Sequence, residues 1–94
     1  MIIVSGKLYV DPIVRDSYLA DCRDIIEKAR STDGCIDFHI AADPLESDRI
    51  NVFEQWASIA DLEVFRGSGP SSEQAAQIRE AQVSQHEVGS SQKL

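Results

Sequence analysis

CIDFHIAADPLESDRINVFEQW, at residues 35–56, contains two runs of alternating apolar side chains separated by a polar segment at residues 43–48. Alternation with a period of two is typical of β-strands, and a short polar connection joins antiparallel neighbours. The expected inner face carries Ile36, Phe38, Ile40 and Ala42 from the first run and Ile50, Val52, Glu54 and Trp56 from the second. The expected outer face carries Cys35, Asp37, His39 and Ala41, followed by Arg49, Asn51, Phe53 and Gln55. The sequence therefore predicts a β-hairpin over these residues.

Upstream of the hairpin, the sequence predicts a strand and then one long helix. Residues 2–10 alternate as a strand does. Asp11 and Pro12 are typical of a helix start, because a carboxylate can cap free N–H groups and proline suits the first helical position. Apolar residues then recur at three- and four-residue steps as far as Ala29, and Gly34 marks the end. This spacing predicts an amphipathic helix of about five turns.

Downstream of the hairpin, the sequence predicts two further helices and a last strand. Ser58 can cap a short helix that reaches Phe65, and residues 67–70, GSGP, interrupt it. A second helix is expected over residues 71–80 and a strand over residues 81–88. Residues 89–94 are expected to be a flexible C-terminal tail, so that residues 1–88 form the single domain.

The predicted order β-α-β-β-α-β is that of a ferredoxin-like α+β sandwich with an antiparallel sheet. Right-handed crossovers place both helical segments on the same face of this sheet, with the first and third strands at its centre. The other face carries Ile3, Tyr9 and Phe53 and has no helix to cover it. An apolar face of this kind predicts a homodimer, and the alternative is a monomer with scattered apolar residues on its surface.

Composition excludes several classes of partner. Nine Lys and Arg against sixteen Asp and Glu leave a net charge of −7 over 94 residues. Nucleic acids and anionic membranes are bound through clustered basic residues, so neither is an expected partner. The chain has no apolar stretch long enough to span a bilayer and no signal-peptide pattern, and its two cysteines match no metal spacing. These features predict a cytoplasmic protein with reduced thiols.

Glu54 is the acid most suited to chemistry. It lies between apolar neighbours on a strand expected at the centre of the sheet. Burial disfavours the charged form of a carboxyl group and raises its pKa, which suits a general base or acid near neutral pH. Trp56, two residues further on the same face, can form the wall of a cavity. The alternatives are a structural glutamate held by hydrogen bonds and an indole ring in an ordinary core.

The run Glu54-Gln55-Trp56-Ala57-Ser58, after a strand, helix and hairpin of this length, resembles the antibiotic biosynthesis monooxygenase domain family. Other shared features are Asp11-Pro12 after the first strand, Asp33-Gly34-Cys35 before the second, and Asp43-Pro44 in the turn. The resemblance covers nearly the whole chain. It implies a ferredoxin-like protomer whose sheet pairs with that of a second copy to form a dimeric α+β barrel.

The resemblance also implies a ligand pocket between the sheet and the helices, lined by Trp56. Some members oxygenate polycyclic phenols or anthrones with molecular oxygen and without flavin, haem or metal, because the deprotonated substrate itself reduces O₂. For this chain we therefore expect a small aromatic substrate of the phenol, anthrone or quinol type, no cofactor, and Glu54 and Trp56 as the catalytic residues. The side chains available to bind the substrate are Asn51, Tyr18, Arg66 and Arg79. Of these, Asn51 alternates onto the face opposite Trp56, and Tyr18 belongs to the apolar stripe of its helix.

Two features that related proteins carry are missing from this sequence, and their absence argues against haem ligation by the helix after the Glu-x-Trp strand and against a Rossmann-type nicotinamide or flavin site. Haem-degrading relatives carry an iron-binding histidine on the helix after the Glu-x-Trp strand, whereas residues 61–66, DLEVFR, contain none. The chain also lacks the glycine-rich turn of a Rossmann dinucleotide site.

His39 and His86 fall on the two expected edge strands, too far apart to share a metal ion. The alternative functions are a non-enzymatic ligand-binding or accessory domain and a proton-transfer isomerase that uses Glu54.

Overall fold

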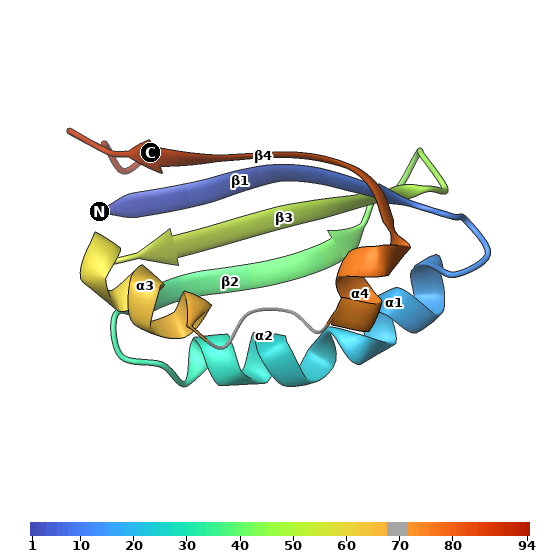
Figure 1. Ribbon diagram of the computed structural model, residues 1–94. Helices are drawn as coiled ribbons and strands as arrows, with labels where there is room; N and C mark the ends of the chain where they lie inside the picture. Colours follow the sequence, from blue (N-terminus) through green and yellow to red (C-terminus); the bar gives the residue numbers. More distant parts are fainter. Residues whose placement is uncertain (68–71) are drawn as a thin grey trace.

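In residues 1–67 and 72–94, which the computed structural model describes, four strands form one antiparallel sheet with helices packed against one face (Figure 1). The elements are β1 (Ile2–Val10), α1 (Arg15–Asp21), α2 (Arg23–Arg30), β2 (Cys35–Ala42), β3 (Arg49–Trp56), α3 (Ile59–Arg66), α4 (Ser72–Gln77) and β4 (Ile78–Glu87). The strand order is β2-β3-β1-β4, so β1 and β3 are central, as predicted. This is the ferredoxin-like α+β fold.

The core between sheet and helices is divided along the length of the sheet. At one end the described residues form the Trp56 cluster, which consists of Ile2, Val4, Ala29, Phe38, Trp56, Leu62 and Phe65. At the other end they form the Ile50 cluster, which consists of Val10, Tyr18, Cys22 and Ile50. Ile25, Ile26 and Ile40 are partly buried and pack against both clusters. The two clusters thus hold the helices at both ends of the sheet.

The helical segment before β2 begins later than predicted and is divided in two. Asp11 caps a turn rather than the helix, because its Oδ1 accepts from the Ile13 N–H at 2.9 Å and the helix begins only at Arg15. The division lies at Cys22, between α1 and α2. Hydrogen bonding continues across it, since Cys22 N–H donates to the Tyr18 carbonyl and Ile26 N–H donates to the Cys22 carbonyl. The predicted single amphipathic helix is therefore two short helices in succession.

The beginning of β2 corrects the predicted side-chain alternation. The pairing of β2 with β3 shifts between Cys35, which lies opposite Trp56, and Asp37, which lies opposite Gln55. Ile36 is the extra residue of this bulge and is 55% exposed. A bulge reverses the alternation on one side of itself. Cys35 therefore packs against the Trp56 cluster, although the sequence predicted it on the outer face.

The C-terminal part follows the predicted order with shifted boundaries. The cap on α3 is confirmed, because Ser58 Oγ accepts from the Asp61 N–H at 3.2 Å. The last strand begins at Ile78, three residues earlier than predicted, so α4 ends at Gln77. The predicted interruption at residues 67–70 and the predicted helix start at residue 71 lie largely outside the described residues. No helix in the described part of the chain is long and apolar enough to cross a membrane.

Candidate functional site

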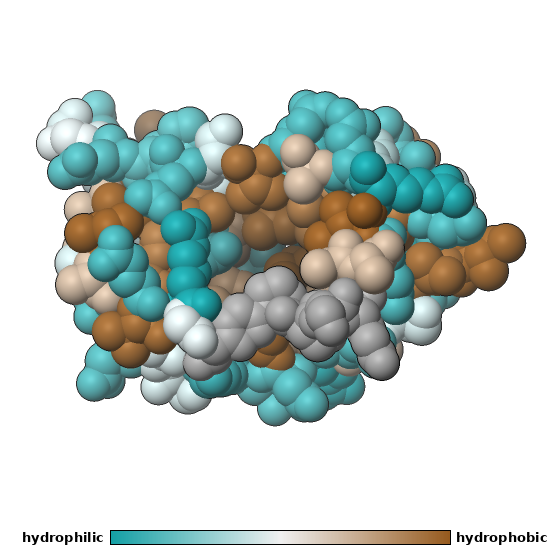
Figure 2. Space-filling view, viewed as in Figure 1, coloured by the Kyte–Doolittle hydropathy of each residue, from teal (hydrophilic) through white to brown (hydrophobic). Residues whose placement is uncertain are grey.

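A cavity of about 270 Å³ lies between the inner face of the sheet and the helices, in the space between the Trp56 and Ile50 clusters. Its described lining comprises Leu8, Tyr18, Cys22, Ile25, Phe38, Ile40, Val52, Glu54, Phe65, Arg66, Gln74, Ile78 and Val83. In Figure 2, apolar side chains border a hollow in this face of the molecule. A mainly apolar lining with a few polar groups is typical of a small-molecule site.

A glycine on the central strand β1 helps to leave this space open. Gly6 on β1 pairs with Val52 on β3 and with Val83 on β4. Gly6 has a φ of 155°, and a Cβ at this position would collide with the backbone of Gln82. Glycine is therefore required here, and the central strand contributes no side chain to the floor at the level of two valines.

Glu54 contributes a carboxyl group to the cavity wall, as the sequence predicted for its side of β3. Its Oε1 accepts a hydrogen bond from the Trp56 indole N–H at 3.0 Å. Burial raises the pKa of the Glu54 carboxyl, and the Trp56 hydrogen bond and the positive charge of Arg66 offset part of that rise. A carboxylate desolvated in this way is a stronger proton acceptor than one in water.

Trp56 is placed behind Glu54 rather than in the cavity. Its side chain is 0% exposed, and its ring packs on that of Phe65 at 5.1 Å between centroids. The described cavity lining includes Phe65 and Glu54, which lie in front of the indole ring. Trp56 can therefore act on a ligand through the carboxyl group that it holds, which is a positioning role.

Tyr18 and Cys22 line the cavity from the Ile50 cluster. Burial and then the neighbouring Cys22 raise the pKa of the Tyr18 hydroxyl. Burial also raises the pKa of the Cys22 thiol, whose sulfur accepts from the Gln74 amide at 3.6 Å. Tyr18 is therefore a neutral hydrogen-bond donor at neutral pH, and Cys22 is a protonated thiol with little nucleophilic character.

Of the two arginines expected to bind substrate, one reaches the cavity. Arg66, in the last turn of α3, lines it and donates to Gln85 Oε1 at 2.9 Å. Arg79 lies elsewhere on β4 and forms an ion pair with Asp11 at 2.9 Å. The β-bulge between Tyr9 and Val10 shifts the pairing beside Arg79. The structure thus gives Arg79 a partner outside the cavity.

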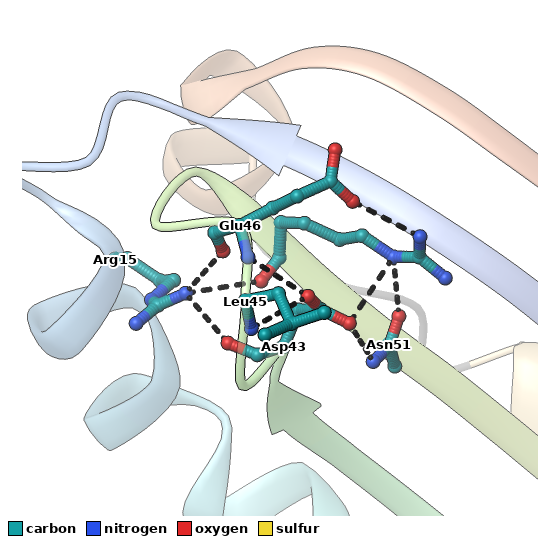
Figure 3. Close-up of polar contacts among 6 residues, drawn as sticks. Arg15, Asp43, Leu45, Glu46 and Asn51 are labelled. Atoms are coloured by element: carbon teal, nitrogen blue, oxygen red, sulfur yellow. Dashed lines mark hydrogen bonds and ion pairs between the residues drawn. The ribbon is translucent and has the colours of Figure 1, made fainter.

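Asn51 also lies outside the cavity, because alternation along β3 puts it on the face opposite Glu54. Its Nδ2 donates to Asp43 Oδ1 at 2.9 Å, and its Oδ1 accepts from Arg49 Nε at 2.7 Å (Figure 3). Arg15 reaches the same turn from α1 and donates to the Glu46 carbonyl at 2.8 Å. Asn51 therefore braces the β2–β3 turn and is not a ligand contact in this cavity.

The two histidines lie on different edge strands, β2 and β4. The His39 ring stacks on Phe53 at 5.2 Å between centroids and lies 4.0 Å from the Asp37 carboxylate. His86 pairs with Ile3 across β1 and β4. Among the described residues, no three His, Cys, Asp or Glu side chains are grouped so that they could hold a metal ion.

Several described lining residues were not among the predicted site residues. Phe38 and Phe65 contact edge to face at 5.4 Å between centroids and form one wall. Gln74 comes from α4 and Val83 from β4, elements that the sequence placed only approximately. The alternation of β2 and the apolar pattern of the helices indicated inward faces but not which inward residues would border empty space.

A second hollow, about 400 Å³, lies at the end of the sheet where Met1, Ala57 and Glu87 meet. Its described lining holds one carboxylate, that of the exposed Glu87, and no aromatic ring. Although larger, it lacks the half-buried acid and the apolar walls of the first cavity. We therefore take the cavity at Glu54 as the candidate site.

Comparison with known proteins gives a family match. A model of the family described as antibiotic biosynthesis monooxygenase matches residues 1–83. A Synechocystis protein described as uncharacterized is 32% identical over 62 residues, which are 66% of this chain and 42% of that protein. The chain thus spans less than half of that relative.

Solved structures share the fold. A Pseudomonas aeruginosa protein superposes with a TM-score of 0.80 at 18% identity, covering 90% of each chain. A structure described as an antibiotic biosynthesis monooxygenase superposes with a TM-score of 0.78 at 19% identity, covering 94% of this chain and 98% of that one. A Mycobacterium tuberculosis protein superposes with a TM-score of 0.78 at 21% identity, covering 98% of each chain. At these identities the likeness shows the fold alone.

Proposed function

Because this chain belongs to the antibiotic biosynthesis monooxygenase family, we propose that it oxygenates a small aromatic metabolite of the phenol, anthrone or quinol type with molecular oxygen. One observation carries the proposal, the Glu54 carboxyl group in an otherwise mainly apolar cavity, where burial raises its pKa. A base in such a place accepts a proton from a substrate held against apolar walls. No cofactor is required for the reaction proposed here.

The proposed reaction begins with proton transfer to Glu54, from the hydroxyl of a phenol or the methylene of an anthrone. The resulting anion is electron-rich and reduces O₂ without a further electron donor. One oxygen atom becomes a new carbonyl on the ring and the other leaves as water, so that phenol plus O₂ gives quinone plus water. The substrate supplies four electrons and both hydrogens of the water. Glu54 returns its proton to the departing oxygen and is ready for another cycle.

The surroundings of Glu54 suit this reaction. Arg66 lines the same cavity, and its positive charge, which lowers the pKa of Glu54, can stabilise a developing phenolate. Apolar walls that include Phe38, Val52 and Phe65 limit the access of water to the reactive anion. Arg66 and Glu54 thus have separate roles, one on the anion and one on the proton.

We propose further that the protein is a homodimer formed through the helix-free face of the sheet. The side chains on this face include Ile3, Tyr9 and Phe53, which are half-buried within one protomer. Pairing two such faces would remove apolar and aromatic surface from water.

Oxygen consumption tests the proposed reaction. Wild-type protein, Glu54→Gln and Glu63→Gln are compared in an oxygen electrode with anthrone, naphthols and hydroquinones, in metal-free buffer without flavin. Glu63 is an exposed acid of α3 and serves as the matched control. We expect uptake by wild type and Glu63→Gln, and a loss of about a hundredfold or more in Glu54→Gln. Equal uptake by Glu54→Gln would remove this residue as the base.

Two other results point to the alternative functions. Absence of uptake by wild type across the panel, with tight binding of an aromatic ligand, would favour a ligand-binding or accessory domain. Exchange of a substrate C–H for deuterium without oxygen uptake would favour a proton-transfer isomerase, because Glu54 would then move a proton without oxygenation.

A further inference from the structure

The candidate cavity has a second polar end, away from Glu54. Tyr18 lines the cavity from α1 and is 4% exposed. It packs with Val10, Cys22 and Ile50, whereas Glu54 lies beside the Trp56 cluster. Ile50 and Glu54 are four residues apart on β3, which corresponds to about 13 Å along a strand. The two polar ends are thus separated by an apolar middle that Leu8, Ile40 and Val52 help to form.

The hydroxyl of Tyr18 is available to a ligand. Within the part of the chain that the structure describes, it forms no hydrogen bond, although nearly the whole residue is buried. The hydroxyl oxygen keeps some accessible surface, and because Tyr18 lines the cavity, this donor is suited to an acceptor supplied from outside the chain. Its pKa is raised by burial, so it stays protonated and donates.

The volume limits the ligand that can lie between these ends. An apolar cavity of about 150 Å³ accommodates a benzene ring. The cavity here is about 270 Å³, which is room for about two fused rings. A single ring would leave one end unoccupied, and four fused rings would extend out of this volume.

We propose that the ligand is a two-ring aromatic with oxygen at both ends, whose acidic hydroxyl contacts Glu54 and whose distal oxygen accepts a hydrogen bond from Tyr18. The inference rests on the proposed function for the role of Glu54 and adds the size and polarity of the substrate. Tyr18 is then a specificity-determining residue, which selects for the distal oxygen and takes no part in proton transfer to O₂.

Three naphthalene probes measure this preference by calorimetric titration under anaerobic conditions, so that binding is separated from turnover. 2-Naphthol has one oxygen, 2,6-dihydroxynaphthalene has oxygen at both ends, and 6-methoxy-2-naphthol has a distal oxygen that can only accept. Wild-type protein is compared with Tyr18→Phe. The matched control is Tyr9→Phe, because Tyr9 lies on the opposite face of the sheet. Thermal melting checks that the variants are folded.

We expect wild type and Tyr9→Phe to bind both distally oxygenated probes about three- to tenfold more tightly than 2-naphthol. Tyr18→Phe should bind all three with the affinity that wild type has for 2-naphthol. The inference is overturned if wild type binds none of the probes or does not discriminate among them. It is also overturned if Tyr18→Phe keeps the preference or weakens all three equally. Selective binding without oxygen uptake would support this inference and contradict the oxygenase reaction, so the two can fail separately.

Discussion

Glu54 and Trp56 lie two residues apart on β3, and that spacing places both side chains on the inner face of the sheet. The indole N–H reaches the carboxylate at 3.0 Å, so the ring that closes the core also fixes the direction of the acid. A buried indole needs a hydrogen-bond acceptor, and a half-buried carboxylate needs a donor. The same contact therefore satisfies both groups and keeps the carboxyl group at the cavity.

Removal of this hydrogen bond should change the titration of Glu54. The Trp56 N–H stabilises the ionised carboxylate, so Trp56→Phe should raise the pKa of Glu54 further above its ordinary value. The measurement is an NMR titration of the labelled glutamate side-chain carboxyl carbons, which requires no substrate. Since the base acts when ionised, any activity that depends on it should also begin at higher pH in the variant.

The control for this titration is Phe65→Leu, which alters packing against Trp56 and leaves the N–H donor in place. An unchanged or lower pKa of Glu54 in Trp56→Phe would contradict the positioning role. An equal rise of the Glu54 pKa in Phe65→Leu would also contradict it, because altered packing alone would then explain the rise in Trp56→Phe.

At the residue scale, alternation along β3 was sufficient to predict that Glu54 points inward and that Asn51 does not share its face with Trp56. The free hydroxyl of Tyr18 was not predictable in this way. Its position in an apolar helical stripe indicates burial, but whether a buried hydroxyl meets a partner or a cavity depends on how α1 docks on the sheet. Docking is decided by contacts between elements far apart in the chain.

At the scale of the elements, the β2–β3 turn is stabilised by Asp43, whose carboxylate accepts three hydrogen bonds. Asp43 Oδ2 accepts from the backbone N–H groups of Leu45 and Glu46 at 3.0 and 2.9 Å (Figure 3). The Asn51 amide bonds to the other oxygen, and Arg49 Nε lies 3.6 Å from it. These hydrogen bonds, that of Asn51 above all, lower the pKa of Asp43 to about 2. An aspartate followed by proline in a polar segment predicted the turn, but not the part that Asn51 and Arg49 play in it.

The ionisation of Asp43 should make the free energy of unfolding depend on pH. Its pKa is about 2 in the folded chain and about 4 when unfolded, so the folded state gains from ionised Asp43 above pH 4. That gain is lost as the pH falls from about 4 to about 2. Asp43→Asn should therefore lower the urea midpoint at pH 7, and the difference from wild type should shrink steadily towards pH 2.

Asp33→Asn is the control for this measurement, because Asp33 is an exposed acid outside the turn. We expect its urea midpoint to follow that of wild type throughout the titration. If the urea midpoint of Asp43→Asn stays below that of wild type by the same amount at pH 2, the ionisation of Asp43 does not account for its stabilising effect.

The positions of the element boundaries depend on pairing between strands, which the local sequence pattern does not predict. The bulge that moves Cys35 inward depends on pairing with Trp56 and Gln55, which are about twenty residues away. The start of β4 at Ile78 is likewise decided by pairing with Val10 of β1. A run such as Ile78–Glu80 is compatible locally with a helix or a strand, and the free edge of β1 decides in favour of the strand.

At the scale of the whole molecule, the sheet has two faces with different roles. The helices and the candidate cavity occupy one face. On the other face aromatic rings meet polar neighbours, with the Lys7 ammonium 5.7 Å from the Tyr9 ring and the His39 ring stacked on Phe53. Aromatic residues within a polar surround are typical of protein–protein interfaces. The net charge of −7 is not concentrated on this face, because Lys7 and Arg49 lie on it together with Asp37 and Glu80.

The proposed homodimer can be tested by placing a charge at the centre of this face. Phe53→Asp should dissociate the dimer, because it replaces an apolar ring at the centre of the interface with a carboxylate that would lose its hydration there. Light scattering at micromolar concentration should give about 21 kDa for wild type, twice the chain mass of 10.4 kDa, and about 10 kDa for the variant. Val64→Asp is the matched control, since Val64 is 74% exposed on α3, away from the helix-free face. A wild-type mass near 10 kDa would exclude the dimer, and a dimer that survives Phe53→Asp but not Val64→Asp would assign the interface to the helices.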